Sequence, residues 1–343
     1  MKAAVLVELN HPLEVCDIDV PKLDVGQVLV KVGYSGICGK QIDEIVGRRP
    51  DPYLPHLLGH EGGGVVQDVG PGVRKVKPGD HVVLHWIKGS GIDSATPRFR
   101  MRGKGTPVNA GCVTTFSDYT IASENRVTRT APGVKPEVAA LLGCAVTTGL
   151  GIVFNNADLK PGESIAVFGV GGMGLNVIQG AVLVSAHPVV AIDLHETKLQ
   201  TARGFGATQV INAKTQDPLA VLRDLSAGRG IDVCVDTTGN RKVREDAYEA
   251  TAPKGRTIFA GVPDATEKIT IDSFPIHFGR KLVGSHGGET RPDDDIPRYL
   301  KLYDLGKLQI DPLITHRFPL EKINEAITLV RSGGAGRCLV QMN

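Results

Sequence analysis

A series of short apolar segments that alternate with helix-length segments, between about residues 146 and 288, constrains this fold most. The segments expected to form strands are 163–169, 188–193, 208–212, 231–239, 255–261 and 281–288. Parallel neighbours need a crossover connection, usually a helix, so this alternation is typical of a parallel sheet covered by helices on both faces. The sequence therefore predicts an α/β domain built on a doubly wound parallel sheet.

A glycine-rich turn follows the first of these strands and opens a helix. It has the form Gly169-x-Gly171-x-x-Gly174, with Gly172 and Met173 inside it. The first glycine allows the tight turn, the second lets a pyrophosphate approach the backbone, and the third lets the helix pack closely on the strand. The amides at the helix N-terminus attract the diphosphate. In this context the motif predicts dinucleotide binding.

The next strand ends in Asp193, about 20 residues after the turn, where an acidic residue hydrogen-bonds the adenosine ribose. The charge of Asp193 would repel a 2′-phosphate, which favours NAD over NADP. Lys198 follows closely and would support either a ribose or a phosphate.

The rest of the chain has a different pattern. Glycine and proline divide the first 130 residues into short apolar segments, which predicts a β-rich, barrel-like unit. The segment 267–272 alternates polar and apolar residues and is expected to be an edge strand, protected by pairing with its copy in a homodimer or homotetramer. Residues 293–308 and 320–333 are expected to be helical.

Composition excludes several classes of function. The net charge is +2 with 22% charged residues, which argues against nucleic-acid and membrane partners. We find no apolar run of membrane-spanning length, and the N-terminus does not have the pattern of a signal peptide. The 6 cysteines are widely scattered, which favours a reducing cytoplasm over a disulfide framework.

Three separate segments carry candidate metal ligands: Cys38 in "GICGKQID", His60 in "LLGHEGGGVV" and Cys144 in "LLGCAVTTGLG". Two thiolates and one imidazole suit Zn²⁺ and leave a fourth position for water or substrate, as in catalytic sites. Buried thiols and a hydrogen-bonded core histidine would also explain these residues. Their spacing leaves both interpretations open.

Several motifs together resemble a known family. "GHEGGGVV", "GCAVTTGLG" and "GVGGMG" are similar to the zinc signature, the third-ligand segment and the cofactor turn of the zinc-containing alcohol dehydrogenases of the medium-chain dehydrogenase/reductase superfamily. "TPRFRMRGK", "TTFSDY" and "DPLITHRFPLEKINEAITLVRSG" resemble its glutathione-dependent and classical branch. The resemblance implies a GroES-like catalytic domain at 1–145 and 288–343 and a Rossmann domain at 146–287.

By this resemblance, Cys38, His60 and Cys144 bind one catalytic zinc ion, with Glu61 beside it. The cofactor would be NAD, and Thr148, Val262 and Arg337 would join the glycine turn in binding it. The implied reaction is hydride transfer between NAD(H) and an alcohol/carbonyl pair. Residues 85–111 lack the cysteines that hold a structural zinc in many relatives, so no structural zinc is expected.

The helix after Cys38 departs from the family pattern. Lys40 stands where relatives carry the hydroxyl that relays the alcohol's proton, and Gln41 stands where they carry an aspartate beside the histidine ligand. A neutral Lys40 amine would accept the substrate's proton; alternatively, Lys40 turns to a substrate anion, to cofactor phosphates or to solvent. Asp43 is a second candidate base. We expect Gln41 to make His60 a somewhat weaker ligand.

The segments similar to the family's substrate pocket supply Trp86, Arg49 and Asn109, followed by small residues. These residues favour a polar, sizeable small molecule, such as a polyhydroxylated secondary alcohol or a conjugate, over ethanol. Two other functions remain open. One is a zinc-free quinone or enoyl-type reductase of the same superfamily; the other is a nucleotide-binding protein that has lost catalysis.

Overall fold

The computed structural model describes residues 1–48, 53–334 and 336–342. Contacts divide it into two compact units. The first comprises Met1–Ala145, Arg291–Asp304 and Ile310–Asn343, and the second comprises Val146–Thr290 and Leu305–Gln309. The chain thus returns to the first unit at Arg291, three residues after the predicted boundary at 288.

The first unit is built mainly from antiparallel strands. One sheet has the order β4-β1-β2-β7-β8, and the other has the order β10-β6-β5-β3-β18-β17 with β9 also paired to β3. Its strands are β1 (Lys2–Leu6), β2 (Glu14–Asp19), β3 (Gln27–Gly36), β4 (His56–Leu57), β5 (Gly62–Val69), β6 (His81–Leu84), β7 (Phe99–Met101), β8 (Pro107–Val108), β9 (Tyr119–Ser123), β10 (Val127–Arg129), β17 (Ile314–Pro319) and β18 (Arg337–Gln341). Its helices are α1 (Gly39–Ile45), α2 (Pro136–Leu142), α9 (Pro292–Asp304) and α10 (Ile323–Arg331).

Strand β3 shows why these segments form a packed sheet. Its side chains alternate between two faces, and Val28, Val30 and Val32 all enter one core cluster. Helix α10 supplies Ile323 and Ile327 to the same cluster. The predicted barrel-like unit and the predicted helix at 320–333 are therefore confirmed.

The second unit contains a parallel sheet in the order β13-β12-β11-β14-β15-β16. Its strands are β11 (Ile165–Phe168), β12 (Val189–Asp193), β13 (Gln209–Asn212), β14 (Ile231–Asp236), β15 (Thr251–Phe259) and β16 (Lys281–Gly284). The order reverses between β11 and β14, as in a doubly wound dinucleotide-binding sheet. The predicted doubly wound architecture is confirmed.

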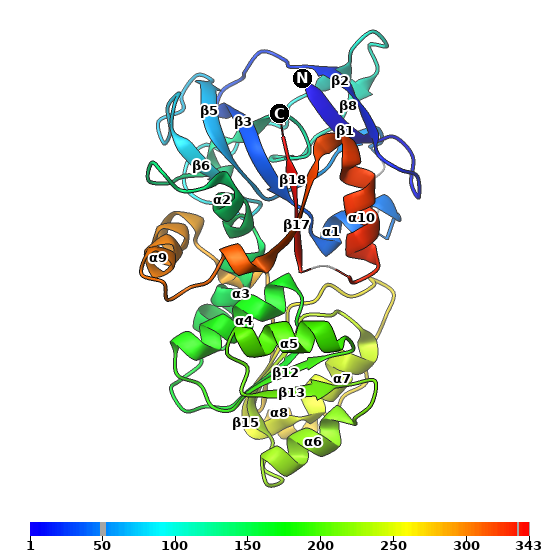
Figure 1. Ribbon diagram of the computed structural model, residues 1–343, viewed down its shortest axis with the longest axis vertical. Coiled ribbons are helices and arrows are strands. Elements are labelled where there is room, and N and C mark those ends of the chain that lie inside the picture. The colour runs from blue at the N-terminus through cyan, green and yellow to red at the C-terminus, as the bar shows by residue number, and fades with distance from the viewer. Residues whose placement is uncertain (49–52, 335, 343) are drawn as a thin grey trace. The chain divides into compact units, whose positions relative to one another are not determined.

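Helices connect these strands (Figure 1). They are α3 (Ala145–Gly151), which continues into a π-helical segment at Ile152–Asn156, α4 (Gly172–Leu183), α5 (Glu196–Gly204), α6 (Pro218–Leu225), α7 (Arg241–Glu249) and α8 (Phe274–His277). Leu222 of α6 and Ala247 of α7 pack with Phe168, Ile192 and Cys234 from the strands in one buried cluster. Burial on both faces explains why these strands are continuously apolar.

The strand predicted at 267–272 does not form within the described chain, and its predicted pairing with its copy in a second subunit stays a prediction. The structure describes these residues as irregular backbone that is mostly exposed. Alternating polarity fits a strand, but a strand forms only when a neighbouring strand accepts its hydrogen bonds, and no neighbour from the described chain pairs with this segment. The sheet instead ends at β16 (Lys281–Gly284).

No single helix among the described residues is long and apolar enough to cross a membrane. By length and composition, only the bent pair Pro136–Leu142 and Ala145–Asn156 passes as a combined segment.

Candidate metal centre and cofactor turn

Three candidate ligands from distant parts of the sequence meet in the first unit. Cys38 directly precedes α1, His60 precedes β5, and Cys144 follows α2. Their ligand atoms all lie within 4.8 Å of one another, and within the described part of the chain no other three His, Cys, Asp or Glu residues are so grouped. The structure therefore brings together the three residues predicted to bind zinc.

Strand pairing explains this convergence. Strands β3 and β5 pair with Ser35 opposite Gly62, which sets the end of β3 beside the segment that carries His60. Helix α2 packs on β5, and this packing places Cys144, which follows the helix, beside the other two ligands. Its last turn comes so close that a Cβ atom on Gly143 would lie 2.3 Å from the Leu84 carbonyl oxygen. Glycine is required at 143 because any side chain would separate α2 from the strands.

A buried ion pair lies beside the three ligands. Arg337, at the start of β18, contacts the carboxylate of Glu61, and their side chains are 8% and 0% exposed. Pairing of β18 with β3, with Leu339 opposite Gly36, fixes this position. Arg337 was predicted to join in binding NAD; the structure places it against Glu61, and the cofactor role stays a prediction.

The electrostatics of the cluster favour a thiolate. A hydrogen bond from the Cys144 thiol holds the pKa of Cys38 well below its usual range, and His60 and Arg337 lower it further. A thiolate, rather than a thiol, is the form that ligates a metal. Burial in turn lowers the pKa of Arg337.

These residues fit a zinc ion. Two cysteines and one histidine form a borderline-soft donor set that zinc prefers. The second carboxylate oxygen of Glu61, Oε2, is buried and has no hydrogen-bond partner, which is costly unless a cation or polar group approaches it. The carboxylate predicted to lie beside the zinc thus has an uncommitted oxygen.

The two candidate bases on α1 are engaged with their own helix or the turn after it. Lys40 contacts the carboxylate of Glu44 one turn along α1, and its side chain is 41% exposed. Asp43 accepts a hydrogen bond from Arg48 at 3.1 Å. Gln41, by contrast, is fully buried and lies against His60.

The predicted cofactor turn joins β11 to α4 in the second unit. Gly169 has φ +86°, which glycine adopts without strain. A Cβ atom on Gly174 would lie 2.1 Å from the Gly169 carbonyl oxygen, whereas one on Gly171 would meet nothing within 4 Å. Gly174 therefore lets helix and strand pack closely, and the space beside Gly171 is open for a ligand. The turn fits a dinucleotide.

Asp193 ties the turn to the next strand. Its Oδ2 atom accepts a hydrogen bond from the Val170 N–H at 3.0 Å, and its Oδ1 atom accepts one from the His195 N–H. Lys198 lies on α5, half-buried. Asp193 thus stands at the carboxyl end of β12, beside the glycine turn, which is where ligands bind in open α/β sheets.

Two further predicted cofactor residues, Val262 and Thr148, lie on segments of the same unit. Val262 follows β15 and is 59% exposed. Its carbonyl oxygen would lie 2.4 Å from a Cβ atom on Gly239, so the loops after β14 and β15 touch at the carboxyl edge. Thr148 lies on α3, and its hydroxyl is buried without a hydrogen-bond partner. Sequence reasoning missed Gly239, although "TTGN" after an apolar strand is a turn signal.

Comparisons with known proteins show the family to which this chain belongs. Residues 24–132 match the family model described as alcohol dehydrogenase GroES-like domain, and residues 172–304 match the one described as zinc-binding dehydrogenase. An alcohol dehydrogenase class-3 of Cereibacter sphaeroides is 36% identical, with 99% of each chain covered. The chain belongs to the zinc-containing alcohol dehydrogenases.

Two further relatives support this assignment. An S-(hydroxymethyl)glutathione dehydrogenase of Synechocystis sp. is 34% identical to the chain described here, again with 99% of each chain covered. A crystal structure of an alcohol dehydrogenase zinc-binding domain protein from Burkholderia ambifaria has a TM-score of 0.93 and 28% identity, covering 100% of this chain and 98% of the other. The predicted family, fold and enzyme class are confirmed.

Of the three residues predicted to line the substrate pocket, the structure describes Trp86 and Asn109. The Trp86 ring lies edge-on to His60, with centroids 6.4 Å apart. Asn109 is exposed and donates hydrogen bonds to the carbonyls of Tyr53 and Pro55. Arg49 lies outside the described residues. Trp86 is thus the predicted pocket residue that the structure places beside a candidate ligand.

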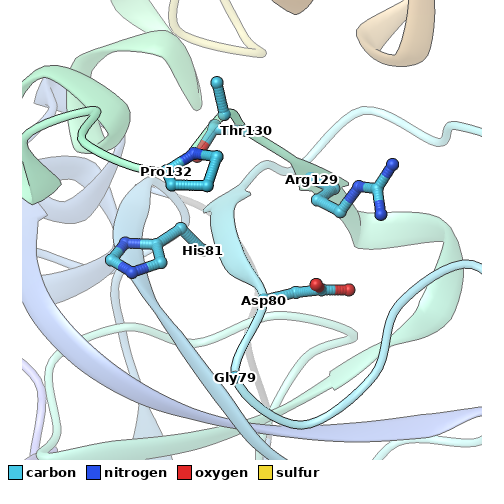
Figure 2. A pocket seen from close by; sticks show the side chains of 7 residues that line it. Gly79, Asp80, His81, Arg129, Thr130 and Pro132 are labelled. Atoms are coloured by element: carbon cyan, nitrogen blue, oxygen red, sulfur yellow. The ribbon is translucent and has the colours of Figure 1, made fainter.

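Sequence reasoning also missed two features of the first unit. One is the buried pair of Glu61 and Arg337, which lie far apart in the sequence and meet only through pairing of β18 with β3. The other is a pocket of about 420 Å³ whose lining includes Asp80, His81 and Arg129 (Figure 2). None of the predicted site residues lines this pocket.

Proposed function

We propose that this protein is a zinc- and NAD-dependent dehydrogenase that oxidises a polar secondary alcohol to a carbonyl compound, or catalyses the reverse reduction. The observation that carries the proposal is the meeting of the Cys38, His60 and Cys144 ligand atoms within 4.8 Å. The open space beside Gly171 in the glycine turn of the second unit supports the binding of NAD. One zinc ion per chain is expected because the described residues contain one cluster of this kind.

The mechanism divides the work between the two units. The chemistry supplied by the bound groups is Lewis acidity toward the alcohol oxygen and a hydride acceptor. Cys38, His60 and Cys144 would hold the metal, and Arg337 balances part of the negative charge of the thiolates and Glu61. Gly171 would let the pyrophosphate approach the backbone, and Asp193 would hydrogen-bond the adenosine ribose. The negative charge of Asp193 favours NAD over NADP.

The path of the substrate's proton is proposed from α1. Lys40 and Asp43 stay the candidate bases. The contact of Lys40 with Glu44 supports the interpretation in which the lysine is turned away from the proton route. A pH profile of kcat/KM for Lys40→Met tests this point, because an unchanged profile leaves Lys40 outside the route.

The substrate is proposed to be a polar alcohol larger than ethanol. One relative is named S-(hydroxymethyl)glutathione dehydrogenase, after a polar conjugate, and another is named alcohol dehydrogenase class-3. Trp86 would form one wall of the pocket, and Asn109 and Arg49 would supply polar groups. A screen of sugar alcohols, cyclitols and hydroxymethyl conjugates with NAD tests the proposal: oxidation of a secondary hydroxyl supports it, whereas turnover of the hydroxymethyl conjugates alone, which carry a primary hydroxyl, would contradict it.

We further infer that two copies of the chain associate through the edge of the second unit. Strand β16 ends its sheet, and Phe274, Ile276 and Phe278 are 69%, 40% and 60% exposed nearby in the sequence. Exposed apolar side chains beside an open strand edge are characteristic of an interface. The variant Phe274→Asp/Phe278→Asp is expected to shift the mass measured by light scattering toward the monomer.

A cytoplasmic location is proposed from the scattered cysteines alone.

The deciding experiment is zinc content per chain by elemental analysis, on the wild type and on Cys144→Ser. About one zinc ion in the wild type, lost in the variant, supports a single site with this ligand set. Cys112→Ser is the matched control, because Cys112 lies outside the cluster; it should keep its zinc.

The other outcomes point elsewhere. About two zinc ions per chain would reveal a structural site. No zinc in freshly purified protein that still holds NAD would overturn the proposed mechanism, and the zinc-free reductase or the non-catalytic nucleotide-binding protein would then take its place.

A further inference from the structure

Gln41 contacts two of the three candidate ligand residues. It lies in α1 and is 0% exposed. Its side-chain oxygen Oε1 accepts a hydrogen bond from the backbone N–H of Cys38 at 3.0 Å. Its amide nitrogen Nε2 lies 2.6 Å from Nδ1 of His60. Both contacts are buried or nearly so, which leaves water little access to substitute for them.

A carboxamide can accept a hydrogen bond from only one of these two neighbours. It has one acceptor end and one donor end, whereas a carboxylate accepts at both oxygens. Because Oε1 already accepts from Cys38, the NH₂ end of Gln41 faces His60. Nδ1 of His60 must therefore be the acceptor in this contact.

A histidine that ligates a metal through one ring nitrogen needs a hydrogen-bond acceptor beside the other. The Nδ1 atom of His60 is turned toward Gln41, so Nε2 is the nitrogen left for the metal. A neutral imidazole that gives Nε2 to a metal carries its proton on Nδ1 and donates it to an acceptor. With Gln41 in its observed orientation, the two N–H groups would point at each other.

Rotating the amide does not remove the conflict. In the rotated position Oε1 would accept the Nδ1–H of His60, but the NH₂ group would then face the N–H of Cys38 in a buried space. One donor–donor contact remains in either orientation, and an unsatisfied buried donor is costly. A carboxylate at position 41 would accept from both donors.

We propose that Gln41 is a positioning residue that weakens His60 as a metal ligand, so that Cys38, His60 and Cys144 bind zinc less tightly than they would with a carboxylate at position 41. The inference rests on the proposed zinc site and adds to it a property of the site, its affinity. Loss of an outer hydrogen-bond acceptor typically lowers metal affinity by about 10- to 100-fold, which is the size of effect expected here.

The surroundings favour testing a carboxylate at this position. Glutamate has the shape of glutamine, so Gln41→Glu preserves the packing of α1. Gln41→Asp provides a second carboxylate of different length if the glutamate variant does not fold.

The experiment compares zinc affinity by competition with a chelator at one pH, in the wild type, Gln41→Glu and Gln67→Glu. Gln67 is exposed on β5, so its variant adds the same charge away from the site. Gln41→Glu is expected to bind zinc about 10- to 100-fold more tightly than the wild type, with Gln67→Glu unchanged.

A spectroscopic readout separates this role from a merely structural one. In zinc-loaded, ¹⁵N-histidine-labelled protein, the His60 Nδ1–H proton should exchange slowly with water in Gln41→Glu and rapidly in the wild type. The resonance is assigned by its loss in His60→Asn.

Equal zinc affinity in the wild type and in a folded carboxylate variant would overturn the inference. If neither protein binds zinc, the proposed metal site itself is wrong. Zinc binding by Gln41→Glu alone would support the inference in its strongest form.

Discussion

The contact between Glu61 and Arg337 sets two opposite charges in the interior of the first unit, with side chains 0% and 8% exposed. Removing one partner leaves an uncompensated buried charge, which typically costs about 3–5 kcal/mol. Arg337→Met is therefore expected to lower the free energy of unfolding of the first unit by about that amount. Urea unfolding of the protein without added NAD measures it.

Two controls make this prediction specific. In the double variant Glu61→Gln/Arg337→Met no charge is left unpaired, so much of the lost stability should return. Arg102→Met breaks an ion pair with Asp19 in which both side chains are 58% exposed, and should leave the free energy of unfolding nearly unchanged. Equal losses in Arg102→Met and Arg337→Met would contradict the argument.

The acid stability of the first unit should depend on His85. Burial lowers the pKa of His85 to about 4, with Lys75 and Arg126 lowering it further and the Ile87 carbonyl and Asp293 opposing them. The pKa in the unfolded chain is about 6.5. Because the unfolded state then binds more protons, stability should fall as pH decreases from about 6.5 to about 4, by about 3 kcal/mol, and be independent of His85 above that range.

Urea midpoints measured between about pH 4 and 7 test this linkage. In His85→Gln the slope of stability against pH should be smaller than in the wild type. His11→Gln changes an exposed histidine and should leave the slope as it is. A slope that persists in His85→Gln would assign the effect to other groups.

At the scale of elements, the β11–α4 turn predicts different effects for two glycines. A Cβ atom on Gly174 would lie 2.1 Å from a backbone oxygen, whereas one on Gly171, whose φ is −73°, would meet nothing within 4 Å. Gly174→Ala is expected to destabilise the second unit by about 1–3 kcal/mol, as overpacking does, and to weaken NAD binding. Gly171→Ala should keep its stability and still lose NAD affinity, because its methyl group occupies the space proposed for the pyrophosphate.

Calorimetric titration with NAD, combined with urea unfolding, separates the two effects. Gly162→Ala is unsuitable as a control because Gly162 has φ +81°; Gly204, at the end of α5, has open space around it and serves instead. If Gly171→Ala binds NAD as tightly as Gly204→Ala, the cofactor does not approach the chain at this turn.

Elements of the second unit could be predicted because each carries its own signal. The apolar runs that became the central strands β11, β12 and β14 are almost entirely buried, so their composition alone marks them. The segment 267–272 shows the limit of this method, since alternation describes one strand but not whether a partner lies beside it. Gln41 shows another limit: the sequence indicates that an amide replaces an acid, but not that its oxygen is already bound to Cys38.

The metal ligands could not be placed by their spacing. Cys38 and His60 meet because β3 pairs with β5, and Arg337 reaches Glu61 because β18 pairs with β3. Pairing between distant strands depends on the whole first unit, so no local window contains it. The family resemblance supplied these ligands because it carries the outcome of that pairing in related chains.

At the scale of the whole molecule, the candidate zinc ligands and the glycine turn belong to different compact units. A ligand that binds the native state stabilises the region that holds it, and local opening of each region is measured by amide hydrogen exchange. Chelating the zinc should therefore speed exchange in 36–41, 58–62 and 142–144 and leave 165–175 unchanged. Adding NAD should slow exchange in 165–175.

Exchange followed by mass spectrometry on peptides from both units checks this expectation. Cys144→Ser provides the control, since a protein that has lost the metal site should not respond to the chelator. If chelation speeds exchange in 165–175 as much as in 58–62 of the wild type, the two units open together, and the metal stabilises the whole chain instead of the unit that holds its ligands.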